Sequence, residues 1–325
     1  MATTSRVHGT KWKKGRSGNR NVIDIRGAKK GGGGSGGGFG GMGGLDGGGG
    51  LPIPGGKGKI GGFIGIVVVL IVIGTQVLGG GSGSSSGFDV GSILNGAGQV
   101  PGANNPSPIP ASEDPDADLK DFSAYVFTDA QQVWRQAFKK DGRPYKDAQL
   151  VLYSGAVSTG GCGNATSAVG PFYCPADKRV YLDLSFYKQM ENQLSAGGDF
   201  AWAYVIAHEM GHHVQNLGGI RDDVARAKRQ DSDSANEISV RNELQADCLA
   251  GVWASTVFDQ LESGDLDEAI NASEAVGDDR LQSRGGGSVN PDSFTHGTSE
   301  QRHHWFQTGY ESGDPAECDT FSGDI

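Results

Sequence analysis

The spacing of hydrophobic positions separates a patterned C-terminal part of the chain from a poorly patterned N-terminal part. Apolar residues recur with helical spacing in the segments 128–140, 185–194, 200–216, 235–261, 266–276 and 299–311. Thr128 and Gln131 have the spacing of a capping box, which predicts that the first helix starts there. Runs rich in β-branched and aromatic residues at 149–153 and 179–184 predict strands. We therefore expect one α+β domain over 119–325, mostly helical, with a small sheet.

One apolar run stands apart from this pattern. Residues 60–78 carry no charge, and as a helix rising about 1.5 Å per residue they would extend for roughly 28 Å, close to the thickness of one hydrocarbon core. A buried core element is the competing interpretation, and a cleaved signal peptide is disfavoured because about sixty residues precede the run. The run predicts a single transmembrane helix.

The segments beside this run have too little apolar surface to fold. Residues 31–62 contain 20 glycines in 32 positions, and residues 79–118 are rich first in Gly and Ser and then in Pro. We expect a disordered tail over 1–59 and an extended linker over 79–118 that holds the domain away from the membrane.

Charge is distributed unevenly around the apolar run. Residues 1–59 contain eleven Lys or Arg and two acids, whereas 17 basic and 36 acidic residues follow Lys59, a net charge of −19. The positive-inside rule then predicts a cytoplasmic N-terminus, an anchor in the inner cell membrane and a periplasmic or extracellular domain. So acidic a domain argues against nucleic acid as its partner. The basic tail either contacts anionic lipid or RNA or serves only as a topology signal.

All four cysteines follow the apolar run, on its predicted outer side. An even number of cysteines outside the cytoplasm indicates disulfides, and four allow three connectivities. We favour Cys162 with Cys174, which closes a short Gly-rich loop, and Cys248 with Cys318, which ties the C-terminal tail to a predicted helix. Metal binding is the competing interpretation, but no C-x-x-C spacing supports it.

The candidate chemistry lies in the predicted helix 200–216. His208, Glu209 and His212 form the pattern H-E-x-x-H, which this composition would produce by chance about 0.005 times per chain. Residues four apart share one face of a helix, so both imidazoles meet one ion, and Glu209 points toward a water on that ion. This is the arrangement of a zinc hydrolase, with a solvated helix face as the competing interpretation.

A catalytic zinc usually has three protein ligands and one open position. Glu243 and Asp247 lie four residues apart on another predicted helix, so both project from one face. We expect Glu243 to be the third ligand and Asp247 to accept the outer N–H of His208, which sets the tautomer of that ring. Glu237 is less suitable because Arg241, four residues later, would repel the ion.

These residues carry a family resemblance. H-E-x-x-H followed by N-E-x-x-x-D at 242–247 resembles the thermolysin-type gluzincins. With Cys162-Gly163 and the runs 170–175, 180–183, 208–215 and 294–298, the chain from about 119 to 321 resembles the bacterial neutral zinc metallopeptidases. The resemblance implies a zincin-like domain, one zinc per chain and hydrolysis of peptide or protein substrates.

Roles follow from this chemistry. Bound zinc would polarise the scissile carbonyl and activate a water, while Glu209 would take the proton of that water and deliver it to the leaving amine. His296, just before a predicted helix, is the candidate donor to the oxyanion, and a structural histidine that caps this helix is the alternative. The strand at 179–184 is either an edge that pairs with extended substrate, with Tyr181 and Asp183 facing the cleft, or an ordinary core strand.

Two classes of function remain. The first is a membrane-tethered zinc peptidase that acts outside the cytoplasm, and the second is a binding or chaperone-like module that keeps zinc for structure. Glu209 distinguishes them, because a structural site needs neither a base beside its first ligand nor an open coordination position. The presence of Glu209 favours the enzyme.

Overall fold

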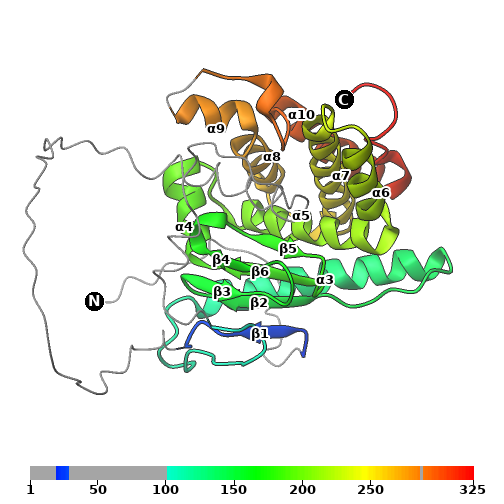
Figure 1. Cartoon of the computed structure of the whole chain (residues 1–325). Helices are drawn as coiled ribbons and strands as arrows, with labels where there is room; N and C mark the ends of the chain where they lie inside the picture. Colours follow the sequence, from blue (N-terminus) through cyan, green and yellow to red (C-terminus); the bar gives the residue numbers. More distant parts are fainter. Residues whose placement is uncertain (1–19, 29–100, 286–287) are drawn as a thin grey trace, which may run out of the picture.

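A small sheet covered by helices forms the part of the chain that the computed structural model describes, residues 20–28, 101–285 and 288–325 (Figure 1). The strands are β1 Val22–Asp24, β2 Gln149–Tyr153, β3 Ala156–Ser158, β4 Asn164–Thr166, β5 Phe172–Cys174 and β6 Arg179–Asp183. The α-helices are α3 Ala117–Lys140, α4 Ser185–Gln189, α5 Asp199–Gly218, α6 Ile220–Gln230, α7 Ala235–Thr256, α8 Asp265–Ala275, α9 Asp278–Arg284 and α10 Ser299–Ser312. The domain is α+β and mostly helical, as expected.

The larger sheet has the strand order β1-β2-β6-β5, with β1, β2 and β6 parallel and β5 antiparallel to β6. Successive side chains of a strand point to opposite faces, and in β2 both faces are buried. Leu150 and Leu152 join the core formed with α3 and α5, whereas Val151 and Tyr153 pack in a second cluster with residues of the β3–β4 hairpin. The sheet is therefore covered on both sides.

Helix α5 is the centre of the helical layer. It packs against β5, β6 and α3 on one side and against α7 and α8 on the other, and α10 packs against α7 and α8. Trp202 of α5 is fully buried, and its indole N–H donates to Ser123 of α3 at 2.8 Å. The helix that carries the H-E-x-x-H pattern is thus held on several sides by the core.

The predicted start of the first helix is wrong, and so is one of the two interpretations of the strand at 179–184. Helix α3 begins at Ala117, ahead of the predicted cap, because Thr128 donates to the carbonyl of Ala124 within the helix and Gln131 accepts the N–H of Ala148. Strand β6 lies between β2 and β5, so its backbone groups are paired on both sides and it cannot be the edge that takes substrate.

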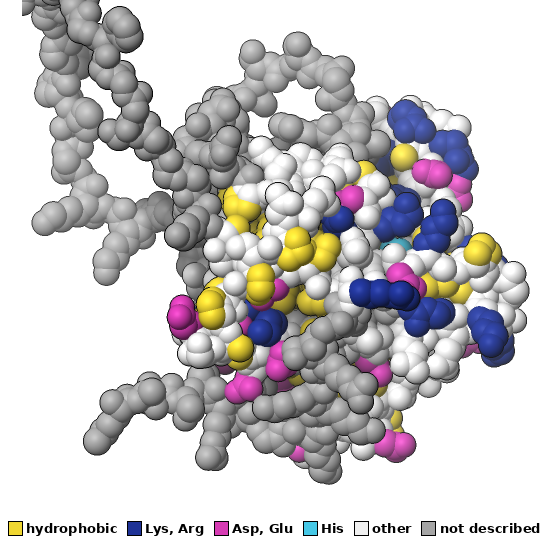
Figure 2. All heavy atoms as spheres, turned by 90° about the horizontal axis from the view of Figure 1, so that it is seen from below, with side chains coloured by type: hydrophobic (Ala, Val, Ile, Leu, Met, Phe, Trp, Pro, Cys, Tyr) yellow, Lys and Arg dark blue, Asp and Glu magenta, His cyan; other side chains and the backbone are white. Residues whose placement is uncertain are grey.

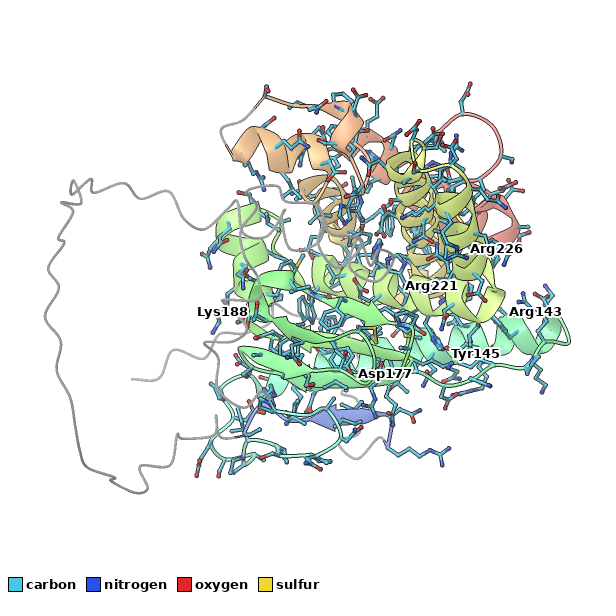
Figure 3. The ribbon with its side chains drawn as sticks, viewed as in Figure 1. Arg143, Tyr145, Asp177, Lys188, Arg221 and Arg226 are labelled. Carbon is cyan, nitrogen blue, oxygen red and sulfur yellow. A yellow bond between two sulfur atoms is a disulfide. The ribbon has the colours of Figure 1, made fainter. Side chains whose placement is uncertain are left out.

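The side chains assigned to that cleft also have structural partners. Tyr181 donates to Asp177, which Figure 3 labels, and Asp183 accepts the N–H groups of Gly155 and Ser185. Both side chains are buried. The interpretation of 179–184 as an ordinary core strand is the one that the structure supports.

The predicted tail and linker also contain ordered parts. Strand β1 adds to the sheet beside β2, with Val22 opposite Leu150 (Figure 1). Arg26 is buried and pairs with Asp114 at 2.6 Å, and the carboxylate of Asp114, with no exposed surface, also binds Lys120. Residues 20–28 and 101–118 therefore belong to the folded domain, because burial of these charges requires their partners.

The predicted transmembrane segment 60–78 lies outside the described residues, as do 29–59 and 79–100. Within the described ranges, no helix combines the length and the apolar character needed to cross a bilayer. The transmembrane helix and the topology derived from it stay predictions.

Both predicted disulfides are present. Cys162 in the β3–β4 turn is bonded to Cys174 at the end of β5, and Cys248 of α7 is bonded to Cys318 near the C-terminus. The competing interpretation, metal binding by these cysteines, is wrong.

Candidate metal centre

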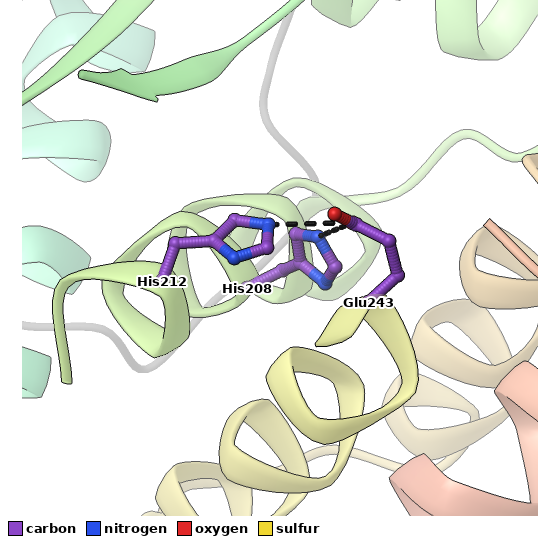
Figure 4. Close-up of side chains that lie close together, drawn as sticks. All are labelled: His208, His212 and Glu243. Atoms are coloured by element: carbon purple, nitrogen blue, oxygen red, sulfur yellow. Dashed lines mark hydrogen bonds and ion pairs between the residues drawn. The ribbon is translucent and has the colours of Figure 1, made fainter. Parts of the chain in front are cut away.

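Helices α5 and α7 bring two histidines and one glutamate together (Figure 4). His208 and His212 lie one turn apart on α5, with ring centroids 4.8 Å apart. Oε2 of Glu243 lies 3.2 Å from Nε2 of His208 and 3.3 Å from Nε2 of His212. Three atoms that can bind a cation thus face a common point, and they belong to the residues that the sequence predicts.

The crossing of the two helices depends on a glycine inside the motif. A Cβ atom at Gly211 would lie 2.9 Å from the carbonyl oxygen of Ala246 and 3.1 Å from its Cα. Both are backbone atoms of α7, so they cannot move aside without shifting the helix that carries Glu243. The glycine between the two histidines therefore allows α7 to approach closely enough for Glu243 to reach them.

Each histidine is oriented by a partner on its outer nitrogen. Nδ1 of His208 lies 2.8 Å from Oδ1 of Asp247, and Nδ1 of His212 lies 2.8 Å from Oε1 of Gln215. Both partner oxygens are acceptors, so each Nδ1 donates a proton to its partner and each Nε2 is the nitrogen left to bind a cation in place of its own proton. The structure places Asp247 as predicted, whereas the part played by Gln215 was missed.

Asp247 belongs to a buried network that the sequence did not reveal. Its side chain has no exposed surface, and Arg302 of α10 binds both of its oxygens, through Nε at 2.8 Å and the terminal nitrogen at 2.9 Å. The hydroxyl of Tyr204, one turn before His208 on α5, donates to the same carboxylate at 2.5 Å. Three donors thus fix the carboxylate that orients His208.

A second chain of hydrogen bonds leads from His212 to a disulfide. The amide of Gln215 donates to the carbonyl of Asn242 and to Gln245 of α7, at 2.7 and 3.1 Å. Gln245 in turn donates to the carbonyl of Cys318 at 2.9 Å. Because Cys318 is bonded to Cys248, the Cys248–Cys318 bridge supports the side chains that orient His212.

The charges around the two imidazoles suit a cation. Burial would lower the pKa of His208, but Asp247 and Glu243 beside it raise that pKa to about 10. Burial would likewise raise the pKa of Glu243, yet the neighbouring His212 and His208 hold it well below its usual range. A positive charge between these groups is therefore favoured.

Glu209 is buried next to this cluster and its carboxylate is not one of the converging atoms. Burial raises the pKa of Glu209, and the histidines and a hydrogen bond from the backbone N–H of Tyr173 act in the opposite direction. Tyr173 lies in β5, which forms the end of the sheet next to α5. The candidate base thus faces the edge strand of the sheet.

His296 is held beside the site by Asp278. The backbone N–H groups of Thr295, His296 and Gly297 all donate to one oxygen of Asp278, and Nδ1 of His296 lies 3.4 Å from the other. A Cβ atom on the next residue, Gly297, would lie 3.1 Å from Val240 and 3.3 Å from Leu244, so this loop packs on α7 beside Glu243, and the charge of His296 lowers the pKa of Glu243. Thr298 caps the following helix α10, so His296 does not have the capping role of the alternative interpretation.

Glu237 and two other histidines are not among the residues whose atoms converge. His213 is fully buried between Tyr173 and Tyr145, the latter labelled in Figure 3, and burial lowers its pKa to about 4. Glu237 is largely exposed and pairs with Arg241, as expected for a residue outside the site. His303 pairs with Glu274.

Comparison with known proteins identifies the family of this chain. A family model described as "Putative neutral zinc metallopeptidase" matches residues 10–321. The chain belongs to this family. The match begins well before residue 119 and includes strand β1, which agrees with the place of that strand in the sheet.

Two relatives show the extent of the similarity. The uncharacterized protein YpfJ of Escherichia coli is 46% identical over 279 residues, which cover 85% of this chain and 91% of YpfJ. The uncharacterized protein Rv2575 of Mycobacterium tuberculosis is 47% identical over 203 residues, which cover 58% of this chain and 66% of that protein. No solved structure gives a significant match.

The family implies zinc, and the three converging residues fit it. Ligand atoms about 2.0 to 2.2 Å from a tetrahedral zinc are separated from one another by about 3.3 to 3.6 Å. The two separations of 3.2 and 3.3 Å are close to this range. Two imidazole nitrogens and one carboxylate oxygen are also a ligand set that zinc prefers.

Proposed function

We propose that this protein is a zinc-dependent peptidase in which His208, His212 and Glu243 hold one zinc and Glu209 is the catalytic base. The observation that carries the proposal is the convergence of the three ligand atoms, with both histidine tautomers set for binding and a buried carboxylate beside them. Zinc, when bound, polarises the scissile carbonyl and lowers the pKa of a water.

Glu209 performs the proton transfers in this proposal. Its burial raises its pKa, so the carboxylate is a better proton acceptor than an exposed glutamate. It accepts a proton from the attacking water and delivers it to the leaving amine. The hydrogen bond from the backbone N–H of Tyr173 holds the carboxylate of Glu209 in place for both proton transfers.

His296 is proposed to stabilise the oxyanion. When its ring carries both protons, Nδ1–H faces Asp278 and Nε2–H remains for an oxygen of the substrate. Asp278 also fixes the backbone of this loop through three N–H groups. A donor held in this way loses little entropy when charge develops on the substrate.

The substrate is proposed to be an extended peptide along β5. This strand is the end of the sheet on the side of α5, and the N–H of its central residue, Tyr173, points to Glu209. An extended chain laid along such an edge would pass the catalytic base. The Cys162–Cys174 disulfide holds the end of β5 in place.

Basic side chains near the site favour acidic segments in that peptide. Burial lowers the pKa of Arg221 and of Lys228, both on α6, while the charge of Glu243 acts in the opposite direction on each. Arg221 is labelled in Figure 3, and Figure 2 shows Lys and Arg side chains around the visible histidine surface. Cleavage sites without enrichment in Asp or Glu would contradict this preference.

The enzyme is proposed to act outside the cytoplasm. Two disulfides support an oxidising compartment, because such bonds rarely persist in a reducing cytosol. The length and lack of charge of 60–78 are those of a membrane segment, but one crossing there would separate strand β1 from the strand β2 with which it pairs, so the anchor stays a prediction from the sequence.

The test is to profile cleavage of a peptide library by the full-length chain with Glu243→Ala and Glu237→Ala as a matched pair. Both variants remove one carboxylate from α7, but only Glu243 faces the histidines. We expect Glu243→Ala to lose zinc and cleavage, and Glu237→Ala to keep both. A wild-type chain that binds zinc at these residues and cleaves no peptide would support the binding or chaperone-like module instead.

A further inference from the structure

A second group of carboxylates lies at the junction of α5 and α8. Asp199 is the first residue of α5, and Asp265 and Glu268 lie in the first turn of α8. One oxygen from each of the three side chains lies within 4.8 Å of the others. None of these residues belongs to the candidate zinc site.

Asp199 is the unusual member of this group. Only 7% of its surface is exposed, and its Oδ2 atom is buried without a hydrogen-bond partner among the described residues. Asp265 is also buried, at 6% exposure, and in the described part of the chain neither aspartate forms an ion pair with Lys or Arg. A buried carboxylate with an unsatisfied oxygen costs free energy unless a cation or a proton compensates it.

The backbone at the start of α5 lies close to the carboxylate of Glu268. Gly198, just before α5, has φ of +122°, and a Cβ atom there would lie 2.1 Å from Oε2 of Glu268. Without that Cβ, Glu268 lies against the start of α5 and accepts the N–H of Phe200 at 3.1 Å. Asp265 accepts the N–H of Glu262 at 2.8 Å. These contacts hold two of the three carboxylates in fixed positions.

We propose that Asp199, Asp265 and Glu268 bind a calcium ion that joins the N-terminal ends of α5 and α8. Calcium prefers carboxylate oxygens at about 2.3 to 2.6 Å, so two of its ligands are separated by at most about 5 Å. The three oxygens lie within this distance of one another. Magnesium requires shorter bonds and a near-ideal octahedron, and it usually keeps several waters.

The proposed ion has a structural consequence for the zinc site. Helix α5 begins at Asp199 and carries His208 and His212 further along. Calcium at its first residue would fix the start of this helix against α8 and compensate the repulsion between the carboxylates. The inference does not depend on peptidase activity.

Calcium content can be measured directly on the full-length chain. After equilibrium dialysis against calcium, atomic emission should find one calcium per wild-type chain besides the zinc. The same measurement on the Asp199→Asn variant should find no calcium. Asp267→Asn is the matched control, because it removes the same charge from an exposed residue of the same turn of α8 and should keep the ion. Glu243→Ala should lose zinc and keep calcium, which separates the two sites.

Thermal unfolding provides the second measurement. Saturating calcium should raise the Tm of the wild-type chain and of Asp267→Asn by about 5 °C or more, and that of Asp199→Asn hardly at all. Equal molarity of magnesium should have a smaller effect. The proposal is overturned if wild type takes up no calcium, which would indicate a shared proton, or if Asp199→Asn takes up as much. If Asp199→Asn does not fold, Glu268→Gln provides the same comparison.

Discussion

Individual residues of the metal centre were predictable where they follow a short motif. His208, His212, Glu243 and Asp247 lie at helical spacings, so their convergence follows from two amphipathic segments. Arg302 lies 55 residues from Asp247, and no local pattern connects the two. The spacing of Tyr204, four residues before His208 on the same helix face, is a weak indication that its side chain lies near the site.

The residues that orient His208 lead to a prediction about zinc affinity. Tyr204→Phe removes one donor to the Asp247 carboxylate without changing the shape of the side chain, and Arg302→Lys removes the two-pronged contact. Loss of such support should weaken zinc binding by about 10- to 100-fold. Competition with a coloured chelator measures this affinity.

Arg135→Lys is the control for the second substitution, because Arg135 forms a largely exposed pair with Asp147 and does not belong to the network around Asp247. It should leave zinc affinity unchanged. If Tyr204→Phe and Arg302→Lys both bind zinc as tightly as wild type, the network does not orient the ligand.

Helices and strands were predictable in proportion to their apolar periodicity. The segments that became α5, α7, α8 and α10 carry long apolar repeats, and their positions agree with the prediction within a few residues. Helix α6 was missed because Val224 is its one buried residue, and Gly218 and Gly219 indicated a stop. Strands β1 and β5 have three residues each, too few to show an alternation.

The Cys248–Cys318 bridge couples two elements to the metal centre. It closes 70 residues, so its loss should lower the free energy of unfolding by about 4 kcal/mol in the loop-entropy estimate. Because Gln245 and Gln215 connect Cys318 to His212, the double variant Cys248→Ala/Cys318→Ala should also bind zinc more weakly. Denaturant unfolding and zinc competition measure the two effects.

The other bridge provides the comparison. Cys162→Ala/Cys174→Ala breaks a link of 12 residues and should cost about 3 kcal/mol, with zinc affinity unchanged. Equal losses of zinc affinity in both double variants would show that the hydrogen-bond chain to Cys318 is not responsible.

The junction of α5 and α8 predicts a pH dependence of stability in calcium-free buffer. Burial, together with Glu268, Asp265 and Glu262, raises the pKa of Asp199 to about 7. The folded chain then keeps a proton that the unfolded chain loses above about pH 4, so this group reduces stability as pH rises from about 4 to 7. The charge of Asp199 also contributes to the raised pKa of Tyr187 on α4.

Asp199→Asn removes this penalty. Relative to wild type, the variant should gain stability between pH 4 and pH 8, by at most about 4 kcal/mol. Urea unfolding at both pH values measures the difference, with Asp267→Asn as control. A difference between variant and wild type that does not change with pH would contradict the raised pKa.

At the scale of the whole molecule, strand β1 bears on the predicted membrane topology. Its pairing with β2 and the Arg26–Asp114 contact require residues 20–28 and the domain to lie in the same compartment. A single crossing at 60–78 with a cytoplasmic N-terminus would separate them. Composition could not reveal this, because the Gly-rich surroundings of β1 hide a strand of three residues.

Compartment reporters fused at Asn19 and after Ile325 decide between the pairing of β1 with the domain and a single membrane crossing at 60–78. The pairing of β1 with β2 predicts the same compartment for both reporters. Opposite compartments would agree with the charge asymmetry and would show that β1 does not pair with the domain of its own chain in the cell.

The central claim is that Glu209 acts as the base of a zinc peptidase. It is tested most directly by comparing peptide hydrolysis by wild type, Glu209→Gln and the control Glu237→Gln in full-length chains with equal zinc content. The amide keeps the shape of Glu209 but cannot accept a proton, so kcat should fall by roughly 10²- to 10⁴-fold in Glu209→Gln and stay unchanged in Glu237→Gln. Hydrolysis by Glu209→Gln at near wild-type rate would contradict the account.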